Sequence, residues 1–266
     1  MTQSNYIAKQ PDVHGWVDYT DAENAVWKTL YERQTKLIEQ RACPEYLKGI
    51  NTLGLNADRI PQCDEVSGIL HALTGWRVEP VAALISFKEF FSLLNQKKFP
   101  AATFIRTADE IDYLKEPDIF HELFGHCPML TNQAFADFTH EVGKLGVSID
   151  SKDHAMLARL YWFTVEFGLI HAADGLRVYG GGILSSKTET VYALESDIPT
   201  RNPFDLLTVL RTKYRYDMLQ KNYFVIESFD ALFNLIKADL VDTFDTARQL
   251  GPLPSDDEEP NETRSC

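Results

Sequence analysis

Two histidines close together in the chain have the residue type and position that a metal centre needs. They lie in the segment PDIFHELFGH, in which His121 is followed by Glu122 and His126 comes last. The pair His121-Glu122 begins like the zinc-protease motif H-E-x-x-H, whose histidines stand at positions i and i+4 of a helix. Here the spacing is i and i+5, which in an α-helix turns the two imidazoles about 140° apart. The pair therefore predicts a shared metal only if the helix is distorted or ends there, which Gly125 and Pro128 favour, or if the site lies off the helix axis. Otherwise one histidine packs in the core and the other caps the helix.

A carboxylate further along the chain is a candidate third ligand. Glu166 lies in LYWFTVEFGL, a segment so apolar that it predicts a buried helix. A buried carboxylate is costly unless it is paired or binds a metal, and pairing with Arg159 or Arg177 is the alternative. Two histidines and one carboxylate form the facial triad of non-heme Fe(II) oxygenases. On the residues alone, an iron oxygenase, a zinc-dependent hydrolase with the neighbouring Glu122 as general base and a metal-binding module without catalysis all stay open.

Six segments in one order carry a resemblance to a known family. PDIFHELFGH, LYWFTVEFGL and YGGGILSS resemble segments of the pterin-dependent aromatic amino acid hydroxylases. TGWRVEPVAALISFKEFF, FIRTADEIDYLKEPD and YFVIESFD extend the resemblance over roughly residues 19–247. The chain is therefore identified as a member of this family. The resemblance implies a single catalytic domain that uses Fe(II), a tetrahydropterin and O2.

The resemblance also implies roles for individual residues. His121, His126 and Glu166 fall on the family's iron ligands, which form its catalytic centre. Arg106 falls on the arginine that binds the substrate carboxylate, and a guanidinium can hold a carboxylate through two parallel hydrogen bonds. The other residues implied for the amino acid pocket are Tyr113, Pro117, Trp162, Phe167, Gly182, Ser185 and Ser186.

A second set of residues is implied for the pterin. Phe90 can stack on the flat pterin ring, and backbone groups of residues 83–87 can pair with its edge. Glu122, next to the ligand His121, is expected to face the gap between iron and pterin. The complete set is Ala83, Ile85, Phe87, Phe90, Glu122, Ala158 and Tyr161.

The expected reaction is the hydroxylation of L-phenylalanine to L-tyrosine. Val225 falls on a position where the tyrosine-hydroxylating members carry an acid, and an apolar side chain there suits phenylalanine. Tryptophan hydroxylation is the alternative within the family. The expected partners are therefore small molecules, namely L-phenylalanine, O2 and the tetrahydropterin, and the chain is expected to be a monomer, with a dimer as the alternative.

Helical periodicity dominates the segments that must position these residues. Helices are predicted over residues 21–41, 44–53, 64–73, 87–96, 119–124, 132–144, 152–171, 204–211 and 229–250. Strands are predicted over residues 77–81, 102–106, 176–179, 190–194 and 223–226. The pattern indicates a mainly α fold with a small β component. We expect one catalytic domain over residues 16–250, a flexible N-terminus over 1–15 and a disordered acidic tail over 251–266.

Composition excludes several classes of protein. The chain has 266 residues, of which 26 are Lys or Arg and 39 are Asp or Glu, so its net charge is −13. Such a surface repels phosphate backbones and anionic lipids, so neither nucleic acid nor a membrane is an expected partner. The four cysteines form no C-x-x-C pair, and no apolar segment has the length of a signal peptide or a membrane span. These features predict a cytoplasmic protein with reduced thiols.

Overall fold

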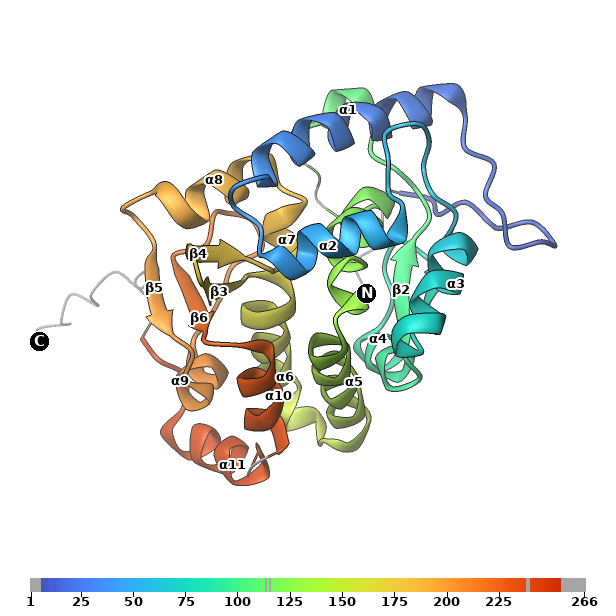
Figure 1. Ribbon diagram of the computed structural model, residues 1–266. Coiled ribbons are helices and arrows are strands. Elements are labelled where there is room, and N and C mark those ends of the chain that lie inside the picture. Colours follow the sequence, from blue (N-terminus) through green and yellow to red (C-terminus); the bar gives the residue numbers. More distant parts are fainter. Residues whose placement is uncertain (1–5, 113, 115, 238–239, 255–266) are drawn as a thin grey trace, which may run out of the picture.

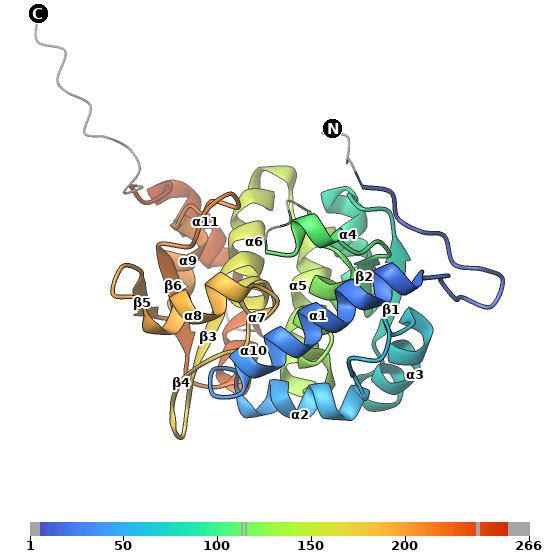
Figure 2. The same cartoon turned by 90° about the horizontal axis from the view of Figure 1, so that it is seen from above.

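Two central helices, α5 (Gln133–Ser148) and α6 (His154–Tyr161), separate a four-stranded sheet from a two-stranded one (Figures 1 and 2). The structure is a computed structural model, and it describes residues 6–112, 114, 116–237 and 240–254. Helices are the main component and the sheets are small, as the sequence predicts.

The remaining helices and strands surround this centre. The helices are α1 (Asp21–Ile38), α2 (Pro44–Leu53), α3 (Cys63–Thr74), α4 (Phe87–Asn95), α7 (Gly181–Leu184), α8 (Lys187–Glu195), α9 (Leu206–Arg211), α10 (Phe229–Lys237) and α11 (Leu240–Leu250). The strands are β1 (Arg77–Val81), β2 (Lys98–Ala102), β3 (Gly168–Ala172), β4 (Gly175–Val178), β5 (Thr200–Pro203) and β6 (Asn222–Ile226). Short 3-10 turns cover Ala108–Glu110, Met129–Thr131 and Ser151–Asp153.

The two sheets pair differently. Strands β1 and β2 are parallel, with Arg77 opposite Lys98. The larger sheet has the order β4-β3-β6-β5, in which β3 and β4 are antiparallel while β6 runs parallel to both β3 and β5. Helices α3 and α4 lie beside the small sheet, on the side of the molecule away from the larger one (Figure 1). The segments between the two sheets are therefore the ones that meet at the centre of the molecule.

Helix α1 crosses over this centre and is attached to it by one buried side chain. Its start has a capping box, in which Glu23 N donates to the Thr20 hydroxyl and Thr20 N donates to the Glu23 carboxylate. In its middle, the buried Gln34 amide donates to Leu184 O at 2.7 Å and to the Thr190 hydroxyl at 2.8 Å. These bonds attach α1 to the end of α7 and to α8.

The predicted strand over residues 190–194 is wrong, because this segment belongs to α8. Its β-branched residues suggested a strand, but Ser186 caps a helix by accepting from Glu189 N at 3.2 Å. The Thr190 hydroxyl then donates to Ser186 O, four residues back, at 2.7 Å, which fits a helical turn. The local cap therefore outweighs the residue preference.

Three other predicted elements have different bounds. The strand predicted over residues 102–106 ends at Ala102 in the structure, and an irregular segment follows. The helix predicted over 152–171 ends at Glu166, and strand β3 begins two residues later. The helix predicted over 229–250 consists of α10 and α11, with residues 238–239 between them outside the described part.

Both predicted terminal segments contain residues that bond to the domain. Residues 1–5 and 255–266 lie outside the described part of the chain, but Tyr6 and Lys9 have hydrogen-bond partners in the domain. At the other end, Leu253 N donates to Arg211 O at 2.9 Å, and Arg211 Nε donates to Gly251 O at 2.7 Å. Residues 6–9 and 251–253 are thus attached, which the predictions for the two termini did not include.

Within the described residues, none of the helices combines the length and the apolar character that crossing a bilayer requires.

Candidate active site

The two histidines lie on one π-helical turn, His121–His126, and not on an α-helix. Backbone hydrogen bonds in a π-helix run from residue i to residue i+5, and Cys127 N donates to Glu122 O at 3.2 Å in this way. Residues five apart therefore lie on the same side of this turn. The distortion that the sequence required for a shared metal is present, and it brings the two imidazoles together.

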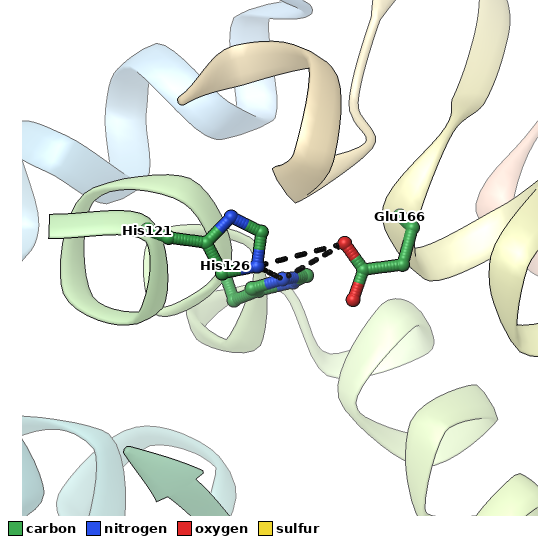
Figure 3. Close-up of side chains that lie close together, drawn as sticks. All are labelled: His121, His126 and Glu166. Atoms are coloured by element: carbon green, nitrogen blue, oxygen red, sulfur yellow. Dashed lines mark hydrogen bonds and ion pairs between the residues drawn. The ribbon is translucent and has the colours of Figure 1, made fainter. Parts of the chain in front are cut away.

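Glu166 ends a second π-helical turn, Trp162–Glu166, which continues α6. The bond from Phe167 N to Trp162 O, 2.8 Å long, again spans five residues. From opposite sides, the Glu166 carboxylate and the two imidazoles point toward one another (Figure 3). Glu166 Oε2 lies 3.3 Å from His126 Nε2 and 3.7 Å from His121 Nε2. The two Nε2 atoms are 2.9 Å apart.

These three atoms fit a single metal ion. An ion about 2.1 Å from each donor, the usual metal–imidazole distance, can touch all three corners of a triangle with these edges. Among the described residues, this is the one group of three such side chains with its ligand atoms within 4.8 Å of one another. Two imidazole nitrogens and one carboxylate oxygen are the donor set of a non-heme iron site. Because all three lie on one side of the ion, its other side stays open.

Ser185 determines which nitrogen of His121 carries the proton. The Ser185 hydroxyl donates to Gly181 O at 2.9 Å, so toward His121 Nδ1, also 2.9 Å away, it can only accept. The proton of a neutral His121 therefore sits on Nδ1, and the Nε2 lone pair faces the metal position. A bond of this kind on the far nitrogen is usual for metal-binding histidines.

The turn at residues 180–182 approaches the ligands so closely that it has no room for side chains. A Cβ atom on Gly181 would lie 2.4 Å from His126 Nδ1, and one on Gly180 would lie 2.3 Å from Glu166 O. Within the described residues His126 Nδ1 has no hydrogen-bond partner, so packing orients this ring. Its other neighbour is Phe99, whose ring centroid is 5.0 Å away. In the structure this turn therefore supports the metal-binding side chains.

Burial and neighbouring charges shift the pKa values of the centre. Burial, together with His126, lowers the pKa of His121 to about 4, so the ring is neutral and able to bind a metal at neutral pH. Burial alone would raise the pKa of Glu166, but the two histidines outweigh it and hold that pKa below its ordinary value. Burial, Glu166 and Asp118 raise the pKa of the neighbouring Glu122 well above its ordinary value.

Arg106 is buried and bound to a buried partner, Asp118. Its Nε and Nη2 atoms donate to the two carboxylate oxygens at 2.8 and 3.0 Å. Arg106 N also donates to Asp118 at 3.0 Å, and His121 N donates to it at 3.1 Å. Asp118 thus connects the arginine to the first ligand. Because Nη1 takes part in none of these bonds, the guanidinium keeps a terminal nitrogen for another group.

A cavity of about 590 Å³ opens at the metal-binding side chains. Both His121 and Glu166 line it, whereas His126 is 2% exposed and lies behind them. All the described residues that the sequence implied for the amino acid pocket line the same cavity, namely Arg106, Pro117, Trp162, Phe167, Gly182, Ser185 and Ser186. Tyr113, the remaining member of that set, lies outside the described residues. The structure therefore gathers residues that are up to 80 positions apart in the chain, from Arg106 to Ser186.

The aromatic wall of the cavity is held by a residue that the sequence did not indicate. The Trp162 ring stacks between Phe167 and Tyr214, with centroid distances of 4.5 and 4.2 Å. Its Nε1 donates to the Gln220 side chain at 2.9 Å, and Gln220 N donates to the buried Glu189 at 3.1 Å. Trp162 and Gln220 are 58 residues apart, and nothing in the local pattern of either residue indicates the pair.

The residues implied for the pterin gather mainly between α4 and α6. Phe90 packs edge-on against Tyr161 at 5.1 Å, and Phe87 stacks on His154 at 3.9 Å. Burial, together with the charges of Glu166 and Glu122, raises the pKa of Tyr161 well above its ordinary value. Of the others, Ala83 is buried and packs in a small cluster with Ala102 and Phe104, whereas Ile85 and Ala158 are half-buried. Their contact with a pterin stays a prediction.

Comparison with known proteins identifies the class to which this fold and site belong. The model of the biopterin-dependent aromatic amino acid hydroxylase family matches residues 2–244. The chain therefore belongs to this family and is a pterin-dependent non-heme iron monooxygenase.

Bacterial phenylalanine-4-hydroxylases are among the relatives that the chain resembles. The protein of Pseudomonas aeruginosa is 54% identical over 94% of this chain and 95% of its own length, and that of Vibrio cholerae is 51% identical over 96% and 87%. The solved phenylalanine hydroxylase of Legionella pneumophila superposes with a TM-score of 0.91 at 55% identity, over 93% of this chain and 98% of the other. The Chromobacterium violaceum enzyme, solved with iron(III) and 7,8-dihydrobiopterin, has a TM-score of 0.86 at 42% identity, over 95% and 93%.

Proposed function

We propose that this chain is a phenylalanine 4-monooxygenase, which converts L-phenylalanine to L-tyrosine with O2, Fe(II) and a tetrahydropterin. The observation that supports it most directly is that two of the three metal-binding side chains, His121 and Glu166, line one cavity with an aromatic wall and a buried arginine. The relatives named phenylalanine-4-hydroxylase, at about 50% identity over nearly the whole chain, support the same substrate over tryptophan. A zinc-dependent hydrolase, which the residues alone left open, does not agree with membership of a pterin-dependent family.

The protein's part in the reaction is to bind and orient. His121, His126 and Glu166 would hold the iron, which together with the tetrahydropterin supplies activated oxygen to the substrate ring. Arg106 would bind the substrate carboxylate through the part of its guanidinium that Asp118 leaves available.

The cavity walls would set the position of the substrate ring. Trp162 and Phe167 offer flat apolar surfaces, and the stacking on Tyr214 and the bond to Gln220 keep the indole in one orientation. Fixing the carboxylate at one end and the ring at the other presents one ring carbon to the oxidant. No protein nucleophile is required. We also propose that Phe90, Tyr161, Glu122 and the other residues implied for the pterin line its site on the α4 side of the metal centre.

Location and assembly are proposals too. We propose a monomer in the cytoplasm, acting on small molecules and without a nucleic-acid or membrane partner. The described cysteines, Cys43, Cys63 and Cys127, are buried thiols, which suits a reducing compartment. Light scattering on the purified protein measures the oligomeric state directly.

The decisive experiment is product analysis of the iron-loaded protein. With L-phenylalanine and a tetrahydropterin we expect tyrosine, and with L-tryptophan a much smaller yield of hydroxylated product. The Glu166→Gln variant removes the one anionic ligand of a hard dication, so we expect weaker Fe(II) binding and nearly complete loss of hydroxylation. Normal iron content and turnover in Glu166→Gln would remove this carboxylate from the site. Tyrosine formation that needs no pterin would contradict the proposed reaction.

A further inference from the structure

The N-terminal segment of the chain, which we call the strap (residues 6–9), lies against the segment that leads into the active site. Tyr6 stacks flat on Phe104, with ring centroids 4.7 Å apart and ring planes 9° from parallel. Its hydroxyl donates to Glu110 Oε1 at 2.5 Å. The two rings, Ala83, Ala102 and Leu114 form a small apolar cluster that is separate from the main hydrophobic core.

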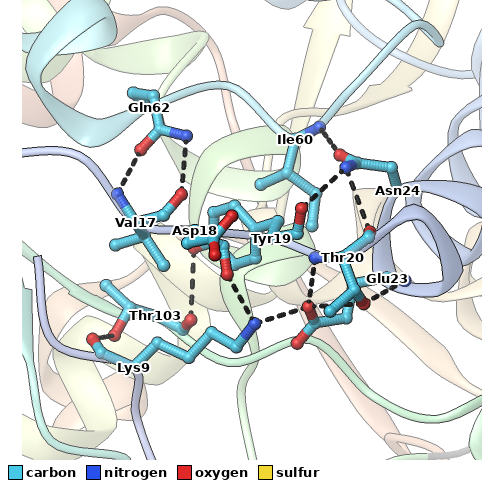
Figure 4. A network of polar contacts seen from close by, with 10 residues as sticks. All are labelled: Lys9, Val17, Asp18, Tyr19, Thr20, Glu23, Asn24, Ile60, Gln62 and Thr103. Atoms are coloured by element: carbon cyan, nitrogen blue, oxygen red, sulfur yellow. Dashed lines mark hydrogen bonds and ion pairs between the residues drawn. The ribbon is translucent and has the colours of Figure 1, made fainter.

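Lys9 attaches the other end of the strap. Its carbonyl accepts from the Thr103 hydroxyl at 2.5 Å, and its ammonium group donates to Glu23 at 2.5 Å and to Asp18 O at 2.7 Å (Figure 4). From the chain that follows the strap, the Tyr19 hydroxyl donates to Thr103 O at 3.1 Å. The strap is thus joined both to the start of α1 and to residue 103, three positions before Arg106.

Residues 103–110, which we call the hub, form hydrogen bonds with the residues that directly precede the metal ligand His121. Phe104 O accepts from Ile119 N at 2.8 Å, and Arg106 makes the three bonds to Asp118 described above. At the far end, Glu110 Oε2 accepts from Thr107 N and from the Thr107 hydroxyl at 3.2 and 2.9 Å. The hub follows the end of β2, and apart from a single 3-10 turn it has no regular structure to keep it in place.

We propose that Tyr6 is a positioning residue for substrate binding, which acts by holding the hub and through it the Arg106 guanidinium. The proposal rests on the proposed function, because it concerns the same substrate. A segment without a sheet partner depends on side-chain contacts for its conformation. Tyr6 supplies two of them, one at Phe104 and one at Glu110, on either side of Arg106 in the sequence. Without them the arginine occupies its binding position for less of the time, and the apparent affinity for the substrate falls in proportion.

The position of Glu110 gives the hydroxyl of Tyr6 an effect of its own. Tyr6 and Thr107 together bind both oxygens of the Glu110 carboxylate. Without the Tyr6 hydroxyl only Thr107, which itself belongs to the hub, binds Glu110, so the bond between the strap and this end of the hub is lost. We therefore expect the loss of the hydroxyl alone to have a measurable effect.

Two variants of the full-length, iron-loaded protein separate these contributions. Tyr6→Phe keeps the ring stack and loses the bond to Glu110, and Tyr6→Ala loses both. We expect the KM for L-phenylalanine to rise about two- to tenfold in Tyr6→Phe, the range expected from one lost hydrogen bond, and several-fold further in Tyr6→Ala. Fe(II) affinity should be unchanged, because neither contact reaches a metal-binding side chain. Ile7→Ala is the matched control, since Ile7 is the next residue and is 86% exposed.

Hydrogen exchange distinguishes positioning from a general loss of stability. In Tyr6→Ala we expect faster amide exchange in residues 103–112, with α5 and the larger sheet unchanged. An unchanged KM for L-phenylalanine in both Tyr6 variants overturns the proposal. So does faster exchange throughout the molecule with equal losses of iron binding and turnover, because that result means a purely structural role. If the unmodified protein forms no tyrosine, the proposed function fails instead, and exchange in residues 103–112 still decides whether the strap holds the hub.

Discussion

Ser185 is the residue on which the chemical form of the first metal ligand depends. Ser185 donates its single hydroxyl hydrogen to Gly181 O, so its oxygen accepts a hydrogen bond from His121 Nδ1. In Ser185→Ala this acceptor is lost, and His121 can then place its proton on Nε2, where the metal should bind.

We expect Ser185→Ala to bind Fe(II) about 10- to 100-fold more weakly, which is the usual effect of removing such a partner. Anaerobic Fe(II) titration measures it. Ser148→Ala, at the exposed end of α5, is the control. Equal iron affinity in the two variants would mean that Ser185 does not orient the ligand.

Arg106→Lys tests the substrate contact. Lysine keeps the positive charge but loses the planar fork that can bind Asp118 and the substrate carboxylate at the same time, and one charge-assisted hydrogen bond contributes about 1.5–3 kcal/mol. We therefore expect the apparent affinity for L-phenylalanine to fall about 10- to 150-fold, with Fe(II) binding unchanged. Steady-state kinetics that count tyrosine and oxidised pterin separately should also show uncoupled pterin oxidation.

The matched control for Arg106→Lys is Arg59→Lys. Arg59 makes an equally two-pronged bond to Glu65, at 2.6 and 2.9 Å, but on the surface. We expect little change in either stability or kinetics there, as for most exposed ion pairs. A wild-type substrate dependence in Arg106→Lys would show that Arg106 has only its structural bond to Asp118.

At the scale of elements, α7 and the π-helical turn that carries the histidines must approach without side chains between them. In Gly181→Ala the new Cβ would lie 2.4 Å from His126 Nδ1 and 2.5 Å from His126 Cε1. Either α7 or the imidazole has to move. We expect loss of hydroxylation, and Fe(II) binding at least tenfold weaker, since a displaced ligand costs about as much as a lost supporting bond.

Gly68→Ala is the control for this substitution. Gly68 lies inside α3, where a Cβ meets nothing within 4 Å. Alanine there should raise the free energy of unfolding by about 0.5–1 kcal/mol, because glycine destabilises a helix interior. If Gly181→Ala also binds iron normally, the close approach of α7 is not needed for the site.

The helical elements could be predicted from the sequence where periodicity was regular, but the two metal-binding turns could not. Residues 44–53 form the predicted helix, because Pro44 starts it and Gly54 ends it in a left-handed conformation. The spacing of His121 and His126 argued against a shared metal, since periodicity arguments assume 3.6 residues per turn. The family resemblance indicated the pair before the geometry did.

Contacts between distant parts of the chain explain what the sequence did not indicate. The bond from Trp162 to Gln220 and the stack of Tyr6 on Phe104 join residues that no local pattern relates. The same holds for Asp118, whose position after a proline predicts a cap and does not reveal Arg106 as its partner. Short motifs therefore found the ligands, while the residues that hold the ligands and the substrate arginine required the structure.

At the scale of the whole molecule, the end of the chain should matter little for folding or activity beyond residue 254. Residues 255–262 combine five acids with one proline and almost no apolar side chains, a composition that cannot bury much surface. We expect a chain that ends at Pro254 to keep its melting temperature and turnover.

A chain that ends at Leu250 should be less stable. It lacks the two hydrogen bonds between Arg211 and residues 251–253, each worth about 0.5–1.5 kcal/mol. Thermal unfolding of the two truncated chains measures the difference. Equal melting temperatures would show that these bonds contribute nothing, and a large loss on ending at Pro254 would show that the acidic residues stabilise the fold.

In both metal-binding turns the backbone hydrogen bond spans five residues, one more than in an α-helical turn. An insertion of a single codon into an α-helix has this effect, and a deletion of a single codon reverses it. Removal of one residue between His121 and His126 would restore the i and i+4 spacing of a regular helix, with every ligand still encoded. The site therefore depends on the number of residues in each turn as well as on their identity. For this reason, when related sequences are compared to find active enzymes, a deletion in either turn should count against activity as strongly as replacement of a ligand.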